Sequence, residues 1–157
     1  MSIPETLRTA AGVWTGQKHL YLPGDPPRTV ASSATVATAA QGRFCTIAYR
    51  WSFEGQPQDG LLLLGQNGDP ATVAVTWIDS WHMGDQAMLC QGPAGHEGPI
   101  SVRGSYAVEG SPDWGWRIDL EAGAEQLRIV MYNVSPEGQE YLGVEAVYSH
   151  ASVEEAS

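Results

Sequence analysis

Positive charge is scarce in this chain of 157 residues. Eight lysines and arginines stand against eighteen acidic residues, which gives a formal net charge of −10 and a pI near 4.6. Neutralising the phosphates of a nucleic acid or an anionic membrane surface requires clustered Lys and Arg. The eight basic residues are instead spread along the whole chain. We therefore expect no nucleic-acid partner and no membrane partner.

Long apolar runs and paired cysteines are also missing. No stretch approaches the roughly 18 apolar residues of a membrane-spanning helix, and the opening M-S-I-P-E-T-L-R lacks the basic and apolar regions of a signal peptide. Cys45 and Cys90 lie far apart without C-x-x-C spacing. Neither a disulfide framework nor a zinc site is indicated. The sequence predicts a cytoplasmic protein with two reduced, buried thiols.

The common motifs of nucleophilic catalysis, nucleotide binding and metal binding are absent. The chain has no G-x-S-x-G, no Walker loop and no G-x-G-x-x-G. The histidines lack H-x-H or H-E-x-x-H spacing, which argues against a metal site. The four are His19, His82, His96 and His150.

The chain does contain a succession of short runs in which apolar and polar residues alternate. The clearest is Arg43–Phe53, whose odd-numbered residues from Cys45 onward form one apolar face. Such alternation predicts half-buried β-strands. Asn67-Gly68 predicts a hairpin between the run 60–65 and the run that starts at Val73, because both residues tolerate the positive φ of a type I′ turn.

About ten strands in sequential hairpins must pack as a sandwich or close into a barrel. Local turns and the absence of a long Greek-key connection favour an all-β fold with a single up-and-down antiparallel β-barrel. We expect one domain over residues 1–157, with a short helix at about 3–11, the barrel at about 12–149 and a frayed tail at 150–157. A barrel of this size often encloses a ligand cavity.

Several motifs along the chain carry a family resemblance. Together they resemble a bacterial calycin-like family catalogued only as a domain of unknown function, and more distantly the lipocalin, fatty-acid-binding and nitrobindin barrels. The resemblance implies a barrel closed at one end by Trp14. Nitrobindin binds haem, so haem remains an alternative ligand, although no histidine here matches the nitrobindin proximal histidine and no other cofactor is expected. The motifs are Gly12–Gly16, Gly42–Phe44, Trp77–His82, Trp114–Arg117 and Met131–Gly138.

The stretch V-A-V-T-W-I-D-S-W-H at Val73–His82 predicts a pocket wall. Asp79 shares the parity of Val73 and Trp77, so its carboxylate should point into the lumen, where it requires a partner. Either Asp79 caps the amides of the following turn, or it orients His82 or a ligand donor. His82 is the best general acid–base candidate, since its unperturbed pKa is about 6.5. The alternative is a rim histidine bonded to backbone.

Other inward-facing aromatic and polar residues are the expected ligand contacts. Arg117 and Glu145 lie opposite the apolar faces of their strands, which predicts an outer cross-strand pair or solvated charges. If a bulge turned them inward, they would form an ion pair able to grip a ligand carboxylate. The expected ligand contacts are Tyr49, Trp51, Trp77, Tyr106, Trp116, Met131 and Asn133.

Three functions remain open. The one we favour is binding of a small hydrophobic or aromatic molecule inside the barrel, because a largely apolar pocket with a few polar groups is typically a binding site. The second is a cofactor-free isomerase, cyclase or lyase in which His82 acts as acid and base and Asp79 orients it. The third is a structural or interaction protein with a filled barrel. An exposed strand edge would also allow a homodimer.

Overall fold

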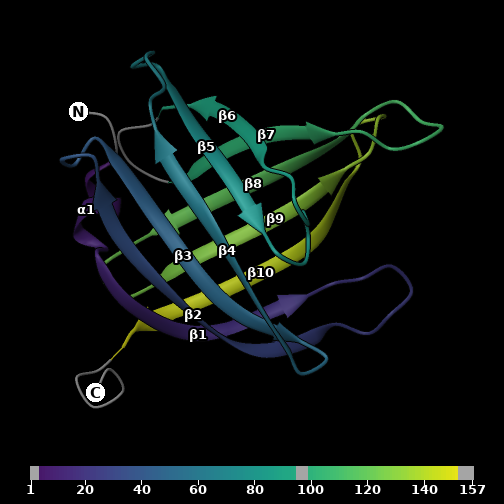
Figure 1. The fold of residues 1–157 in the computed structure, drawn as a ribbon, viewed down its shortest axis with the longest axis horizontal. Helices are drawn as coiled ribbons and strands as arrows, with labels where there is room; N and C mark the ends of the chain where they lie inside the picture. The colour runs from purple at the N-terminus through teal and green to yellow at the C-terminus, as the bar shows by residue number, and fades with distance from the viewer. Residues whose placement is uncertain (1–3, 95–98, 152–157) are drawn as a thin grey trace.

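The computed structural model describes residues 4–94 and 99–151, which form an antiparallel up-and-down barrel of ten strands with one short helix before it (Figure 1). Each strand pairs with its neighbours in sequence, and β1 pairs with β10 to close the barrel. The predicted fold class is confirmed. In chain order the elements are α1 (Glu5–Thr9), β1 (Gly12–Leu20), β2 (Arg28–Ala39), β3 (Phe44–Phe53), β4 (Gln56–Gly65), β5 (Thr72–Asp79), β6 (Met88–Pro93), β7 (Ile100–Tyr106), β8 (Trp114–Ala122), β9 (Leu127–Val134) and β10 (Glu140–His150).

One end of the barrel is closed by α1 and the start of β1 (Figure 1). Leu7 and Ala10 are buried there, and the Trp14 side chain is fully buried. Its indole Nε1 donates a hydrogen bond of 2.8 Å to the carbonyl oxygen of Ala10. The Trp14 ring also stacks on His150 with ring centroids 3.7 Å apart. His150 is the last residue of β10, so the strand runs one residue further than predicted, and residues 152–157 of the predicted tail lie outside the described residues.

The half of the barrel next to α1 is filled with its own side chains. In β3 Cys45 and Ile47 are buried at this end, and Tyr49 and Trp51 are buried further along the strand. The residues between them are more exposed, as the alternation predicts. The register of the strands brings Leu64 opposite Val75, and both are buried at this end. These side chains fill the interior at this end. A polar groove of about 650 Å³ lies outside that packed interior, between Arg8 and the β2–β3 and β4–β5 loops.

The hairpin predicted at Asn67-Gly68 joins β4 to β5, and both residues have positive φ, 53° and 90°. Its loop is longer than a two-residue turn, because β4 ends at Gly65 and β5 begins only at Thr72.

The loops β1–β2, β3–β4, β5–β6, β7–β8 and β9–β10 lie at the end away from α1 (Figure 1). We call this the open end and the α1 end the closed end. No helix within the described ranges has the length and hydropathy needed to cross a membrane.

Candidate ligand site at the open end

Asp79 ends β5 and holds the turn that follows it. One carboxylate oxygen, Oδ1, accepts hydrogen bonds of 2.8 Å from the backbone N–H groups of both Trp81 and His82. The other, Oδ2, accepts a hydrogen bond of 2.5 Å from the Tyr49 hydroxyl. Asp79 is thus a turn cap and a partner of Tyr49. Among the described residues, no hydrogen bond joins its carboxylate to the His82 ring.

Tyr49 links this carboxylate to the wall of the barrel. Its hydroxyl oxygen accepts a hydrogen bond of 2.9 Å from Trp77 Nε1 while donating to Asp79. Burial, and then the negative charge of Asp79, raise the pKa of Tyr49 well above its usual value. The phenol therefore stays protonated and remains a donor over the working range of pH.

The imidazole of His82 is folded back among indole rings. Burial lowers the pKa of His82 from 6.5 to about 4, with Asp79 opposing the shift and Lys18 adding to it. The ring is therefore neutral near pH 7, and its Nε2 atom is buried with no hydrogen-bond partner in the described part of the chain. The ring centroids of Trp51, Trp77, Trp81 and Trp116 lie 6.0, 5.6, 4.6 and 5.7 Å from that of His82.

Lys18 enters the same region from β1. Its side chain is 2% exposed, and its Nζ lies 3.4 Å from the centroid of the Trp51 ring and 5.5 Å from that of Tyr49. Burial lowers the pKa of Lys18 from 10.5 to about 8, and the nearby charge of Asp79 opposes the shift. The cation–π contact with Trp51 offsets part of the hydration free energy that the ammonium group loses on burial.

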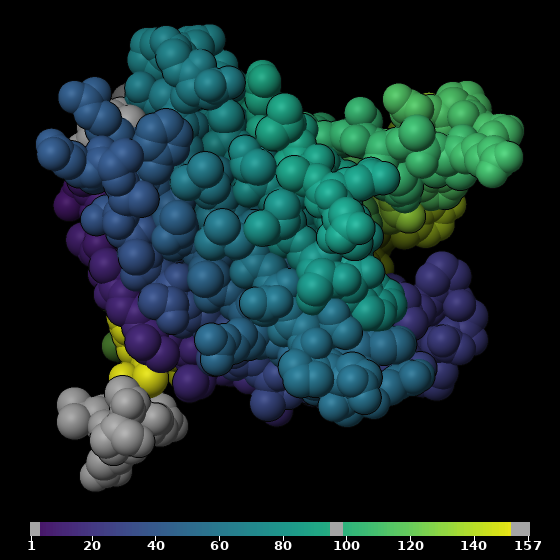
Figure 2. Space-filling model, viewed as in Figure 1, coloured from purple at the N-terminus to yellow at the C-terminus, as the bar shows by residue number. Residues whose placement is uncertain are grey.

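A cavity of about 730 Å³ opens above this layer. We call it the mouth cavity. Figure 2 shows its opening as a hollow between the green lobe of the β7–β8 region and the purple lobe of the β1–β2 loop. Most of the lining is apolar or aromatic. The mouth cavity is lined by Leu20, Tyr21, Leu22, Pro23, Trp81, His82, Trp114, Trp116, Asn133, Glu140, Tyr141, Leu142 and Gly143.

A second cavity of about 420 Å³ lies on the β6–β7 side. His82 and Trp116 line both cavities, so these two side chains stand between them. Trp116 is held by stacking on Trp77, with ring centroids 5.3 Å apart and planes inclined by 8°. The second cavity is lined by Trp77, His82, Met83, Gln86, Met88, Tyr106, Ala107 and Trp116.

A family model described as "Protein of unknown function (DUF1579)" matches residues 3–150. The chain belongs to this DUF1579 family. No curated protein matches it. Among solved structures, Rv2717c from M. tuberculosis is similar, with 12% sequence identity and a TM-score of 0.64 over 96% of this chain and 99% of the other. At that identity the likeness shows the fold alone, and the calycin relationship stays a prediction.

In this DUF1579 barrel the predicted contact residues fall into three groups. Trp116 lines both cavities, Asn133 lines the mouth cavity, and Trp77 and Tyr106 line the second one. Tyr106 also donates a hydrogen bond of 2.5 Å to Asn133 Oδ1, which joins the two walls. Tyr49 and Met131 lie deeper, beside a void of only about 10 Å³. Trp51 is buried against Lys18.

Sequence reasoning missed several lining residues. Trp81 was not predicted because it follows the end of β5, where strand parity no longer indicates the direction of a side chain. Tyr141 and Leu142 begin β10 and are half exposed. Lys18 had a usable signal: it is the only lysine in the chain, and it shares the parity of Trp14.

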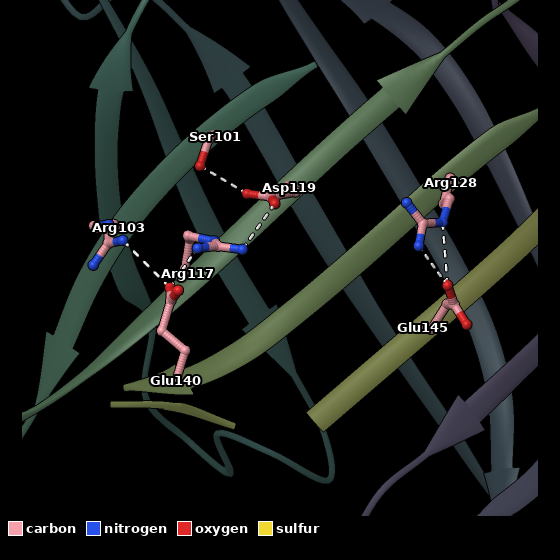
Figure 3. Close-up of polar contacts among 7 residues, drawn as sticks. All are labelled: Ser101, Arg103, Arg117, Asp119, Arg128, Glu140 and Glu145. Carbon is pink, nitrogen blue, oxygen red and sulfur yellow. Dashed lines mark hydrogen bonds and ion pairs between the residues drawn. The ribbon is translucent and has the colours of Figure 1, made fainter. Parts of the chain in front are cut away.

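Arg117 and Glu145 lie on the outer face of the barrel, one of the predicted alternatives, but the predicted pair between them is wrong. Figure 3 shows Arg117 with Asp119 and Glu140, and Glu145 with Arg128. Arg117 is on β8 and Glu145 is on β10, and β9 lies between these two strands. The two side chains are therefore too far apart to pair, and each pairs with a closer residue. Arg128, on β9, reaches Glu145 on the adjacent strand at 2.5 Å.

Proposed function

We propose that this protein binds a small hydrophobic or aromatic molecule in the mouth cavity. The observation that carries the proposal is the cavity itself. Its volume, about 730 Å³, lies within the range of about 300–1,000 Å³ that is usual for small-molecule sites. A pocket of that size in a barrel whose other end is tightly filled favours ligand binding over a barrel filled throughout.

The lining supports an aromatic ligand. Trp81, Trp114, Trp116 and Tyr141 present rings to the cavity, and stacked or edge-on aromatic contacts contribute about 0.5–1.5 kcal/mol each beyond area burial. Asn133 and Glu140 supply the few polar atoms that would orient the molecule. Among the described histidines, His82 alone lines the mouth cavity, so it is the side chain to replace if the purified protein shows a Soret band from haem.

The enzyme alternative has less support. Asp79 is committed to two backbone amides and the Tyr49 hydroxyl. The pKa of His82 near 4 is poorly matched to proton transfer near neutral pH. Binding without turnover is therefore the function we put forward.

The proposed compartment is the cytoplasm. Cys45 and Cys90 are free and buried. Burial raises the pKa of each thiol to about 11, which keeps them protonated and unreactive. Free thiols of this kind suit a reducing compartment.

Tryptophan fluorescence during titration with 2-naphthalenemethanol tests the proposal. We expect saturable quenching, together with at least about tenfold weaker binding in Trp116→Ala, equivalent to about 1.4 kcal/mol. Tyr132→Ala is the matched control, because Tyr132 packs under Arg117 on the outer wall. Equal affinity for the wild type and Trp116→Ala, or no saturable quenching at all, contradicts the proposal. Native mass spectrometry of the protein as purified identifies any retained ligand.

A further inference from the structure

The chain has one lysine, Lys18, and that lysine is 2% exposed inside the barrel. Lysine is almost never fully buried unless it is paired. Within residues 4–94 and 99–151, no carboxylate oxygen lies within 4.0 Å of its Nζ and no hydrogen bond to it is present. Its contacts are with the faces of Trp51 and Tyr49. Structural pairing therefore does not account for this amine.

The charges around Lys18 indicate which ligand chemistry fits. Asp79 is the carboxylate whose charge acts on Lys18, and it is held by Tyr49 and two backbone amides. A ligand carboxylate would add a second negative charge to this buried region, at a high desolvation cost. A carbonyl compound adds none. Its imine with Lys18, once protonated, carries the same single positive charge as the ammonium group and keeps Asp79 as counter-charge.

The position of Lys18 allows contact with the mouth cavity. Leu20 lines that cavity and lies two residues along the same face of β1, a rise of about 6.6 Å. The void that Lys18 lines is only about 10 Å³, room for about one water molecule. The flexible four-carbon side chain can cover the rise by rotating toward the open end. Lys18 itself does not line the mouth cavity, so its amine would meet a molecule bound there only in this rotated conformation.

We propose that Lys18 forms a reversible imine with an aldehyde or ketone that binds in the mouth cavity. The inference rests on the proposed function and names its ligand class. The neutral amine attacks the carbonyl carbon, a C=N bond forms, and the C–O bond breaks. The oxygen leaves as water with both amine hydrogens, so no oxidant or reductant is needed. Burial supports the step, because a lysine with a pKa of about 8 has much more neutral amine near pH 7 than an exposed one.

Reductive trapping with 2-naphthaldehyde and sodium cyanoborohydride at pH 7 tests this. The protein is the Arg50→Lys variant, in which Arg50, exposed on the outer face of β3, becomes a second lysine within the same molecule. Peptide mapping then compares the two amines. Each trapped site gains the mass of the aldehyde less one oxygen. We expect Lys18 to be labelled at least about tenfold faster than the exposed lysine, because its pKa is lower.

Two controls complete the design. Excess 2-naphthalenemethanol should slow labelling at Lys18 and leave the exposed lysine unchanged, because the alcohol occupies the mouth cavity without forming an imine. Lys18→Arg, made in the sequence without the Arg50→Lys change, should keep label only at the N-terminal amine. Labelling of Lys18 at or below the rate of the exposed lysine overturns the proposal. If the alcohol still quenches tryptophan fluorescence in that case, imine formation fails while ligand binding stands; if it does not, the proposed function fails as well.

Discussion

The two ends of the barrel use tryptophan differently. At the closed end Trp14 is fully buried, and its only polar atom donates to Ala10. At the open end Trp51 Nε1, Trp116 Nε1 and His82 Nε2 are buried without a partner in the described residues. Each unmade hydrogen bond of this kind costs about 1–3 kcal/mol. Arg8 Nε, in α1, is also buried without a partner in the described residues, so the difference concerns the ring nitrogens. The indole of Trp14 is hydrogen-bonded, whereas the rings at the open end retain a cost that contacts with a ligand could offset.

Two basic groups near the open end have lowered pKa values. The pKa of Lys18 and that of His82 are both lowered by burial toward the open end. Burial causes both shifts, and the charge of Asp79 opposes them. Strongly desolvated groups beside a specific charge are typical of functional sites. Residues at the closed end therefore mainly stabilise the fold, whereas residues at the open end are available to bind a ligand. Substitutions at each end can test this difference.

The largest expected effect is at the closed end. Trp14→Ala should destabilise the protein by about 3–5 kcal/mol, because it removes a fully enclosed indole and leaves a cavity. Urea denaturation followed by circular dichroism measures the loss. Trp116→Ala is the paired variant, and it should lose less stability because Trp116 already borders two cavities. A greater loss for Trp116→Ala would reverse the comparison.

The next effect is a pH dependence set by His82. Its pKa is about 4 in the folded protein against 6.5 for the free side chain, so on acidification the unfolded chain binds the proton first. The contribution to stability is present above pH 6.5 and is lost as the pH falls toward 4, by about 2–3 kcal/mol. His82→Phe should remove this pH-dependent part of the stability from unfolding curves recorded between pH 6.5 and pH 4. Identical pH profiles for the two proteins would show that the ring is not held neutral by burial.

A gain in stability is expected from replacing the buried amine. The pKa of Lys18 falls from 10.5 to about 8 on folding, so its contribution is lost as the pH drops from 10.5 to 8 and stays lost below that. At pH 7 Lys18→Met should therefore stabilise the protein by about 1–2 kcal/mol, after allowing for the lost cation–π contact. Thermal unfolding at pH 7 and at pH 10.5 measures this, and the gain should shrink at the higher pH. A loss of stability at pH 7 would mean that Lys18 serves the fold.

The smallest effect belongs to the outer wall. Arg128 is 40% exposed and Glu145 is 27% exposed in their ion pair, and exposed pairs of this kind contribute about 0.2–1 kcal/mol. Arg128→Ala should therefore shift the urea midpoint little and leave ligand quenching unchanged. A change in affinity would mean that the outer wall is coupled to the mouth cavity.

The fold was accessible from sequence because its determinants are local. The alternation in β3 predicted which side chains are buried, and Asn67-Gly68 predicted the β4–β5 hairpin. The site was only partly accessible. Strand parity predicted that Trp116 and Asn133 face inward. Beyond Asp79 the path of the chain depends on tertiary contacts, so parity could not predict that His82 lies among four indoles.

The Arg117–Glu145 prediction failed for a related reason. Parity places a residue on a face of the sheet, whereas its partner depends on strand order and register. In the structure β9 lies between the two strands concerned and supplies Arg128 to Glu145. Lys18 was missed because lysine and arginine were counted together over the whole chain, which hid the fact that it is the only lysine.

The pairing of β1 with β10 has a practical consequence. It brings the first and last strands together at the closed end, where Trp14 lies opposite His150, while ligands are proposed to enter at the other end. A tag, a fluorescent protein or a sensor surface joined to the chain before α1 or after β10 would therefore be attached at the end of the barrel opposite the entrance. The barrel could be immobilised with its mouth facing the sample.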